Sequence, residues 1–458
     1  METRIIGIDL AVKAAHKAIV LDRARNEFVS PLLTIHTDPA DLTRLLTAAR
    51  HNATEPVRLL AVMEATGMAW YPISVFLARH GVELYRVNGQ QVGELRRIYQ
   101  RRAKSDRIDA RVLASLPLLY PDRLHRLTLP SGPQMTLQRV CREVARLKQQ
   151  ATAIKNRLRS IDQYVWLGLS EIVPPYGPEA RWIRSHWYDP YRVQATGAAA
   201  LRRDWQRWAP EANNTAPWIE PFVQRADQVC CLYGPQPELE YDQLQASLQR
   251  EQTRWLALQQ EATDLRLHTV RPWYRRLYPQ RYLETLRGVG QDSAAVYIAF
   301  IGDILRFPSL DQFRGWSGMI PYSAQSGTGQ AQGLHITQAG PDLLKATAFL
   351  NAGVARQWDP QLAAIYFEQM MVYGKHHHQA VCACATHLLN RIYAVLREDR
   401  PYQLRDVDER PLTTGEARAI CLDRYHVPAE VRRRNNYRVR QARAEQRTEQ
   451  RYRRRPQK

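Results

Sequence analysis

Short apolar runs separated by polar segments open the chain. Between residues 4 and 35, three such runs rich in β-branched side chains predict three antiparallel strands. Residues 38–51 follow, with apolar positions at helical spacing behind an aspartate suited to capping a helix. Residues 57–64 form another apolar run that ends on Glu64. This alternation predicts a domain of the α/β class.

The same alternation continues over the next stretch. Residues 71–81 have helical spacing and end at Gly81, which is suited to close a helix, and residues 82–88 return to a strand pattern. Three strands, a helix, a strand, a helix and a strand, followed by helices, is the element order of an RNase H-like fold. We therefore predict an RNase H-like domain over residues 1–130.

A heptad pattern then marks two long helices. The apolar seam of the first is Leu137, Val140, Val144, Leu147, Ala151, Ile154, Leu158 and Ile161. The second seam is Tyr241, Leu244, Leu248, Trp255, Leu258, Ala262 and Leu265. We predict a coiled-coil arm over residues 131–275. The two helices could pair as an antiparallel hairpin or across a dimer, and the pattern does not choose.

The sequence between the two seams is rich in proline and tryptophan and looks like an insertion, over about residues 167–235. Its tryptophans are Trp182, Trp187, Trp205, Trp208 and Trp218. Tryptophans can stack on nucleic-acid bases, but at this density they more often form the core of a small domain. We favour the core.

The last part of the chain is predicted to be helical. Residues 276–400 form a third domain, and its Gly-Val-Gly turn at 288–290 resembles a helix-hairpin-helix that offers backbone amides to a phosphate. Residues 401–458 form an Arg-rich tail without apolar periodicity from about residue 428. We expect this tail either to lack structure until it meets nucleic acid or to be a solvated, frayed helix.

Composition narrows the class of partner. Lys and Arg number 65 against 45 Asp and Glu, a formal charge of +20, which favours a polyanion such as nucleic acid. No run of 18 uncharged apolar residues occurs, so no membrane span is predicted. The six cysteines lack a disulfide-framework spacing, which favours a reducing compartment. We expect a cytoplasmic, nucleoid-associated protein.

Four carboxylates carry the candidate chemistry. Asp9 ends the first strand, Glu64 ends a later one, and Asp106 and Asp109 are three residues apart on a predicted helix, so they share one face. Hard oxygen ligands suit Mg²⁺ or Mn²⁺, which could assist displacement at a phosphodiester. Each acid alone has a structural alternative, such as helix capping by Asp106 or an ion pair of Asp109 with a nearby arginine.

A second possible metal site lies at residues 376–387. His376, His377, His378, Cys382, Cys384 and His387 are all zinc-ligand types. The two cysteines are two residues apart and so point to different faces of an apolar helix. We therefore set a zinc site aside.

Three motifs resemble those of a known family. GIDLA at residues 7–11, VMEATG at 62–67 and KSDRIDA at 104–110 resemble the RuvC-like DEDD domain of the IS110 (IS116/IS902) insertion-sequence transposases and the related Piv-type invertases. Residues 286–340 resemble that family's C-terminal domain, with its G-x-x-P, Ser-Gly and I-T-x-x-G features. The chain departs from the family at Gln338, where lysine is frequent, and at Pro341, where Asn or Asp is usual.

The resemblance implies an activity and its residues. The DEDD carboxylates fall on Asp9, Glu64, Asp106 and Asp109, and the nucleophilic serine on Ser326, with Ser323 as its neighbour and competitor. It further implies a homo-oligomer, dimer or tetramer, that recombines donor and target DNA with Mg²⁺ or Mn²⁺, guided by an element-encoded bridge RNA. Candidate nucleic-acid contacts are Lys104, Arg107, Arg287, Gly288, Gly290, Gly327, Lys345, Arg432, Arg433 and Arg434.

The sequence therefore predicts a transposase that cuts and rejoins DNA for insertion-sequence mobility. Two alternatives stay open. One is a Piv-like site-specific invertase or RuvC-like resolvase, which would use the same chemistry. The other is a decayed transposase that only binds nucleic acid.

Overall fold

The computed structural model describes residues 1–54, 56–64, 67–87, 106–120, 124, 126–211, 216–320, 325–326, 329–330, 336–337 and 339–453. Contacts divide the chain into two compact units. Unit 1 comprises residues 1–132 and 303–340, and unit 2 comprises residues 133–302 and 341–458. Each unit is described by itself.

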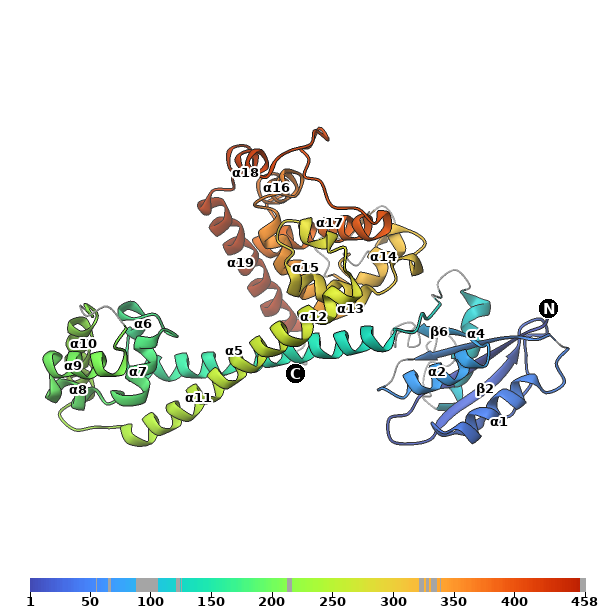
Figure 1. Cartoon of the computed structure of the whole chain (residues 1–458), viewed down its shortest axis with the longest axis horizontal. Helices are drawn as coiled ribbons and strands as arrows, with labels where there is room; N and C mark the ends of the chain where they lie inside the picture. Colours follow the sequence, from blue (N-terminus) through green and yellow to red (C-terminus); the bar gives the residue numbers. More distant parts are fainter. Residues whose placement is uncertain are drawn as a thin grey trace. The chain divides into compact units, whose positions relative to one another are not determined.

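Unit 1 contains one mixed sheet with helices on both faces (Figure 1). Its strands are β1 (Thr3–Asp9), β2 (His16–Asp22), β3 (Glu27–Phe28), β4 (Leu33–Ile35), β5 (Arg58–Glu64) and β6 (Glu83–Val87). The order is β3-β2-β1-β5-β6, with β4 also pairing with β2. β2 is antiparallel to β1, whereas β5 is parallel to β1 and β6 is parallel to β5. The predicted α/β class is confirmed.

Alternation along β1 explains the two layers of helices. Ile6 and Ile8 share a core with the helices α1 (Pro39–Arg50) and α2 (Trp70–Arg79). Ile5, on the other face, shares a core with α4 (Asp106–Leu119). Successive side chains of a strand point to opposite faces, so the apolar centre of β1, residues 5–8, is buried on both sides.

The ends of these elements follow from local chemistry. The Asp38 side chain caps α1 by accepting a hydrogen bond of 2.9 Å from the amide of Asp41, as the sequence predicts. Gly81 has a φ of +80°, which favours glycine just beyond α2. The third predicted strand is instead two short strands, β3 and β4, on either side of Pro31. Proline cannot donate to a strand ladder, so the run is interrupted there.

Unit 2 contains the two predicted long helices. They are α5 (Gly132–Val165) and α11 (Tyr241–Leu265). Ile154 and Trp255 belong to one hydrophobic core, and Arg157 forms an ion pair of 2.8 Å with Glu251. The helices therefore pair as a hairpin within one chain, which is the first of the two predicted arrangements (Figure 1).

The insertion folds into short helices at the end of this hairpin (Figure 1). These are α6 (Leu169–Ile172), α7 (Pro178–His186), α8 (Pro190–Thr196), α9 (Ala198–Trp208) and α10 (Ile219–Tyr233). Trp182 and Trp205 are buried and in edge contact with each other and with Trp218. The core interpretation of these tryptophans is confirmed, while Trp208 keeps 40% of its surface exposed.

The remaining described elements are helices, apart from one small hairpin. Unit 1 adds η4 (Ile304–Arg306), α14 (Leu310–Ser317), β7 (Gln325–Ser326) and β8 (Gly329–Gln330). Unit 2 adds η2 (Arg266–Val270), α12 (Arg271–Leu277), η3 (Tyr282–Thr285), α13 (Gln291–Ile301), α15 (Asp342–Ala355), α16 (Pro360–Phe367), η5 (Glu368–Val372), α17 (His377–Glu398), α18 (Thr414–Asp423) and α19 (Ala429–Arg453).

Of the two alternatives for the Arg-rich tail, the structure shows the helix, α19, which follows α18. Thr413 and Glu416 form a capping box at the start of α18. Asn435 of α19 is 1% exposed and donates hydrogen bonds to the backbone of η5 and of the following turn. Polar anchoring of this kind leaves no apolar periodicity in the sequence. Across the described residues, no helix combines the length and the apolar character that crossing a bilayer requires.

Candidate active site

Asp9 and Glu64 end two neighbouring parallel strands. Ile8 of β1 pairs with Met63 of β5, so the next residue of each strand is one of the two acids. Glu64 pairs in turn with Val87 of β6. The carboxyl ends of β1, β5 and β6 thus meet at one edge of the sheet, the usual place for a site in such folds.

Asp109 lies on the helix that covers the same strand. It lies on α4 and is 5% exposed. α4 crosses β1 at Gly7, where a Cβ atom would lie 2.1 Å from the carbonyl oxygen of Ala110 and 2.5 Å from the amide nitrogen of Ala114. Only glycine allows this approach. The sequence analysis missed Gly7, although a lone glycine in an apolar strand signals close backbone contact.

Asp106 is the first residue of α4, one helical turn before Asp109. The side chains of Asp106 and Arg107 lie outside the described residues, as does Lys104. Of the four predicted carboxylates, the structure therefore describes the side chains of Asp9, Glu64 and Asp109, and for Asp106 the backbone alone.

The donor set of this edge fits a hard cation. Three carboxylates on β1, β5 and α4 offer only oxygen ligands, which suit Mg²⁺ or Mn²⁺. Among the described residues, the three metal-ligand types whose ligand atoms already lie within 4.8 Å of one another are instead His36, Asp38 and Asp41. These have structural partners, since His36 pairs with Asp41 at 2.8 Å and Asp38 caps α1.

A buried histidine orders the loop that follows Asp9. The Nδ1 atom of His16 accepts a hydrogen bond of 3.1 Å from the amide of Ala11, and its Nε2 atom lies 2.9 Å from the Thr37 hydroxyl. Burial, aided by the nearby His36, lowers the pKa of His16, so the ring is neutral near pH 7 and can accept. This role of His16 could not be predicted from its position at the start of a strand.

The segment that carries Ser326 is closed at its base by two glycines. Gly318 and Gly340 have φ values of +71° and +73°. A Cβ atom on Gly318 would lie 1.9 Å from the Ala339 carbonyl oxygen, and one on Gly340 would lie 2.4 Å from that of Ser317. The amide of Thr337 also donates a 3.0 Å hydrogen bond to Ile320.

This contact explains two sequence motifs together. Gly318 begins the G-x-x-P motif and Gly340 ends I-T-x-x-G, so the motifs meet where the loop leaves and returns. Within the loop, Ser326 of β7 pairs with Gly329 of β8 in a tight hairpin. The side chain of Ser326, and Ser323, Gly327 and Gln338, lie outside the described residues.

Unit 1 also holds two arginines that the sequence analysis missed. Arg86 lies on β6, one residue before the partner of Glu64, and stacks 5.2 Å over the ring of Trp70. Arg306 stacks over Phe307 and Trp316 at 4.2 and 4.7 Å. Burial, and then the charge of Arg86, lower the pKa of Arg306 to about 10. The segment leading to Ser326 therefore approaches the sheet beside its carboxyl edge.

The predicted nucleic-acid contacts of unit 2 have different surroundings. Arg287 is exposed and donates a hydrogen bond to Thr414. Gly288 has a φ of +85° and packs against α15, where a Cβ atom would lie 2.7 Å from the Asn351 carbonyl oxygen. Gly290 is the exposed N-cap position of α13. The position of Gly288 is thus explained by packing alone.

Among the remaining predicted contacts, Lys345 and the arginines of α19 differ in exposure. The side chain of Lys345 is 11% exposed and pairs with Asp342 at 3.0 Å. Arg432, Arg433 and Arg434 are exposed on α19. The arginines of α19 are therefore the accessible cations of this set.

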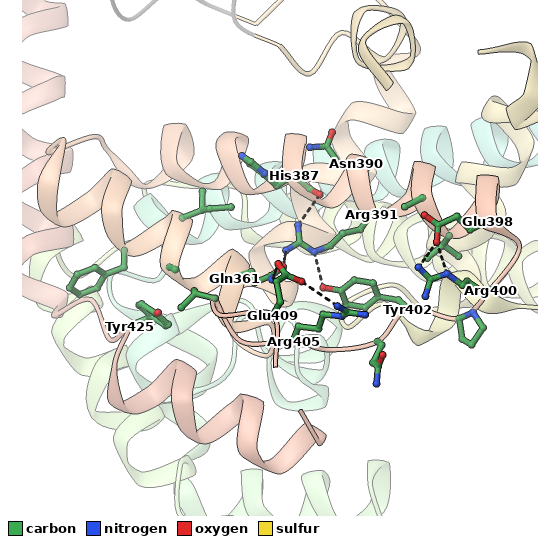
Figure 2. Close-up of a pocket in the computed structure, with 18 of the residues that line it drawn as sticks. Gln361, His387, Asn390, Arg391, Glu398, Arg400, Tyr402, Arg405, Glu409 and Tyr425 are labelled. Carbon is green, nitrogen blue, oxygen red and sulfur yellow. Dashed lines mark hydrogen bonds and ion pairs between the residues drawn. The ribbon is translucent and has the colours of Figure 1, made fainter. Parts of the chain in front are cut away.

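A cavity of 850 Å³ lies in unit 2, between α16, α17 and the segment after α17. Figure 2 shows Arg391 reaching from α17 toward Gln361 and Tyr402, with which it forms hydrogen bonds of 2.8 and 2.9 Å. Arg400 and Arg405 on its rim pair with Glu398 and Glu409. Arg391 and Arg400 hold the segment to α17, and Arg405 pairs within the segment, so these cations stabilise the structure.

Two segments of the chain match known protein families. Residues 6–165 match a family described as transposase, and residues 280–367 match the transposase IS116/IS110/IS902 family. The 43.6 kDa protein of insertion element IS110 from Streptomyces coelicolor is 25% identical over 332 residues, covering 71% of this chain and 78% of the relative.

Two further relatives are similar to different extents. The 44.8 kDa protein of IS116 from Streptomyces clavuligerus is 23% identical, covering 86% of this chain and 95% of the relative. The pilin gene-inverting protein of Moraxella lacunata is 27% identical, over 28% of this chain and 40% of the relative. The chain belongs to the IS116/IS110/IS902 family of insertion-element transposases.

Proposed function

We propose that this transposase cuts and rejoins DNA with a composite site, made of the carboxylates at the sheet edge and the hydroxyl of Ser326. The observation that carries the proposal is the packing of α4 against Gly7, which brings Asp109 to the strand that ends in Asp9. Asp109 is buried and Asp9 and Glu64 are partly buried, and carboxylate oxygens on adjoining rigid elements are the ligands that a hard cation prefers.

The carboxylates would hold the cation. Asp9, Glu64, Asp106 and Asp109 are the proposed ligands of Mg²⁺ or Mn²⁺. Bound there, the ion would withdraw charge from phosphate oxygens and lower the pKa of a coordinated hydroxyl. The protein's own contribution is to fix the ligands on rigid elements, because α4 cannot shift while Gly7 and Ala110 are in contact.

The serine would form the covalent intermediate. Its Oγ atom attacks a phosphorus atom of the DNA backbone, a serine–phosphate ester forms, and the bond to the leaving oxygen breaks as that oxygen takes a proton. Attack by a second DNA hydroxyl reverses the step and releases the serine. The number of phosphodiester bonds is conserved, so rejoining needs no external energy source.

Arg86 and Arg306 fit a supporting role in this reaction. Both are held against aromatic rings beside the sheet edge. Two guanidinium groups close to a carboxylate site offset the repulsion between those carboxylates and a phosphate. We infer that they bind the DNA backbone next to the bond that is cut.

One gel tests the composite site. Purified protein is incubated with Mg²⁺, donor-end DNA and RNA from the noncoding sequence that flanks the gene, and then denatured. We expect a protein–DNA adduct in the wild type and none in Ser326→Ala or Asp106→Ala. Cleavage without an adduct would instead indicate attack by water, and binding without cleavage would indicate a protein that has lost catalysis.

Partners beyond DNA are also proposals. A bridge RNA that pairs with donor and target DNA, and assembly as a dimer or tetramer, follow from the family resemblance and fit the formal charge of +20. Omitting the RNA from the same reaction tests the first, since adduct formation should then be lost.

Site-specific inversion is the second candidate function, favoured by the similarity to the pilin gene-inverting protein. It would use the same carboxylates and serine. A plasmid with two inverted recombination sites separates the two, because an invertase reverses the intervening segment without excising or inserting any DNA.

A further inference from the structure

The last helix of unit 2 has one flank that is rich in arginines. α19 runs from Ala429 to Arg453, and Asn435 lies on the face that packs against unit 2. Exposed arginines on the rest of the described surface include Arg433, Arg438 and Arg440. They stand on two different flanks, because residues three, four or seven apart share a side of a helix.

The first flank carries no acidic residue beyond the first turn of the helix. It contains Arg433 and Arg440, seven residues apart, and the same spacing continues in the sequence to Arg443, Arg447 and Arg451. Glu445 and Glu449 fall by the same spacing on the other flank, with Arg438, whereas Glu430 in the first turn is three residues from Arg433 and four from Arg434. We call the first side the arginine flank.

The helix is fixed to the body of unit 2 at its beginning. The Asn435 amide donates hydrogen bonds of 2.8 and 3.3 Å to the carbonyl oxygens of Met370 and Lys375. The side-chain oxygen of Asn436 accepts one of 3.1 Å from the amide of His377. These bonds satisfy carbonyls around the π-helical turn η5, so the direction in which α19 leaves the body is set before any ligand binds.

The dimensions of the flank match one class of ligand. Positions 433–451 span roughly 27 Å of helix axis at 1.5 Å per residue. The major groove of B-form DNA is wide enough for one helix, whereas the A-form groove of duplex RNA is deep and narrow. Arginines without interleaved acids neutralise phosphates, and contacts to phosphates carry no sequence information.

We propose that the arginine flank of α19 binds the backbone of duplex DNA, independently of its sequence. This inference rests on the proposed function for the identity of the duplex as donor or target. It assigns binding, not catalysis, to α19. The contacts add to affinity in proportion to the phosphates that they neutralise.

The test compares two single variants of the full chain. Arg440→Gln removes a charge from the arginine flank, and Arg438→Gln removes the same charge two residues away on the other flank. Binding to a 30-base-pair duplex of arbitrary sequence is measured by fluorescence anisotropy from 50 to 300 mM salt. For Arg440→Gln we expect about tenfold weaker binding and a salt dependence reduced by about one counterion.

Arg438→Gln should match the wild type in both quantities, and unchanged thermal midpoints show that both variants fold. Equal losses in the two variants would overturn the proposal, as would a larger effect of Arg440→Gln on an RNA duplex of the same sequence. Adduct formation at saturating protein should survive in Arg440→Gln. If no adduct forms in any variant while the binding difference stands, the proposed function fails and this inference holds.

Discussion

At the scale of single residues, the geometry of the candidate site depends on the absence of a side chain at Gly7. Gly7 has no Cβ, and this lets the backbone of α4 lie directly on β1, with Ala110 and Ala114 at the contact. Asp109 is next to Ala110 in sequence, so its distance from Asp9 and Glu64 depends on the same contact. A larger side chain would separate helix from strand.

We therefore expect Gly7→Ala to lose DNA cleavage and to lower the free energy of unfolding by about 1–3 kcal/mol or more, because overpacking moves backbone as well as side chains. Urea unfolding and a cleavage assay measure the two effects. Gly315→Ala is the matched control in the same unit, since a Cβ atom there meets nothing within 4 Å. Full activity in Gly7→Ala would show that the spacing of α4 does not matter.

His377 gives unit 2 a dependence on pH. Burial, followed by the charges of Arg432 and Arg356, lowers its pKa from 6.5 to about 4. Its Nδ1 atom lies 2.8 Å from the Tyr366 hydroxyl. As the pH falls below 6.5 the unfolded chain takes up a proton that the folded chain refuses, so stability falls between pH 6.5 and 4 and then levels off.

Replacing this ring should remove the effect. His377→Gln is expected to flatten the loss of stability between pH 6.5 and 4, followed through the urea midpoint at each pH. His378→Gln is the control, because this neighbour is exposed on the same helix and should leave the pH dependence in place. An unchanged pH profile in His377→Gln would assign the dependence to other groups.

Residue patterns located the acids at the strand ends but not the residues that position those strands and loops. Asp9 and Glu64 could be found because each ends an apolar run. Gly7 and His16 could not be ranked, since a glycine in a strand and a histidine at its start are each common for other reasons. Arg86 and Arg306 are 220 residues apart in the chain, and only tertiary contacts relate them.

At the scale of elements, the loop that carries Ser326 is defined by its base. Gly318 and Gly340 each occupy a left-handed conformation and each lie against backbone of the other side. Glycine is required twice over, by conformation and by space. The loop can thus differ in sequence while its ends stay fixed, which is the arrangement that a positioned nucleophile needs.

Gly340→Ala should therefore reduce adduct formation by at least tenfold while leaving DNA affinity within about twofold, because a loop shifted by 1 Å misaligns a nucleophile without altering the binding surface. A gel for the adduct and anisotropy for binding measure the two. Weaker DNA binding with normal adduct yield from the bound fraction would instead place this loop among the binding elements.

Element type was predictable wherever a single period dominated. The strands β1, β2, β5 and β6 and the helices α1, α2, α4, α5 and α11 follow their apolar patterns. The failures have local causes. Pro31 divided an expected strand, and the pattern of α19 could not choose between an unstructured tail and the helix that asparagine hydrogen bonds anchor. Such anchors depend on the partner's backbone, which the sequence does not display.

At the scale of the whole chain, charge is distributed unevenly. The formal charge is +20, yet residues 166–240 contain seven arginines, no lysine and nine acidic residues. This segment includes the insertion, whose core is built from tryptophans and from a buried ion pair between Arg184 and Asp162. Its surface lacks the excess of cations that phosphate binding needs.

Nucleic-acid crosslinks should accordingly avoid the insertion. After ultraviolet irradiation of the protein bound to DNA and RNA, we expect mass spectrometry to find crosslinked peptides outside residues 166–240, with α19 among them. Crosslinks concentrated at Trp208, which keeps 40% of its surface exposed, would instead make the insertion a base-stacking surface.

The most direct test of the composite site is to map the covalent junction between protein and DNA formed with Mg²⁺. Trypsin releases Ser326 in one peptide, residues 315–345, because no lysine or arginine interrupts it after Arg314. We expect a nucleotide on Ser326 in the wild type and none in Asp109→Asn. A nucleotide on another peptide, or an equal yield from Asp109→Asn, would contradict joint action of the serine and the carboxylates.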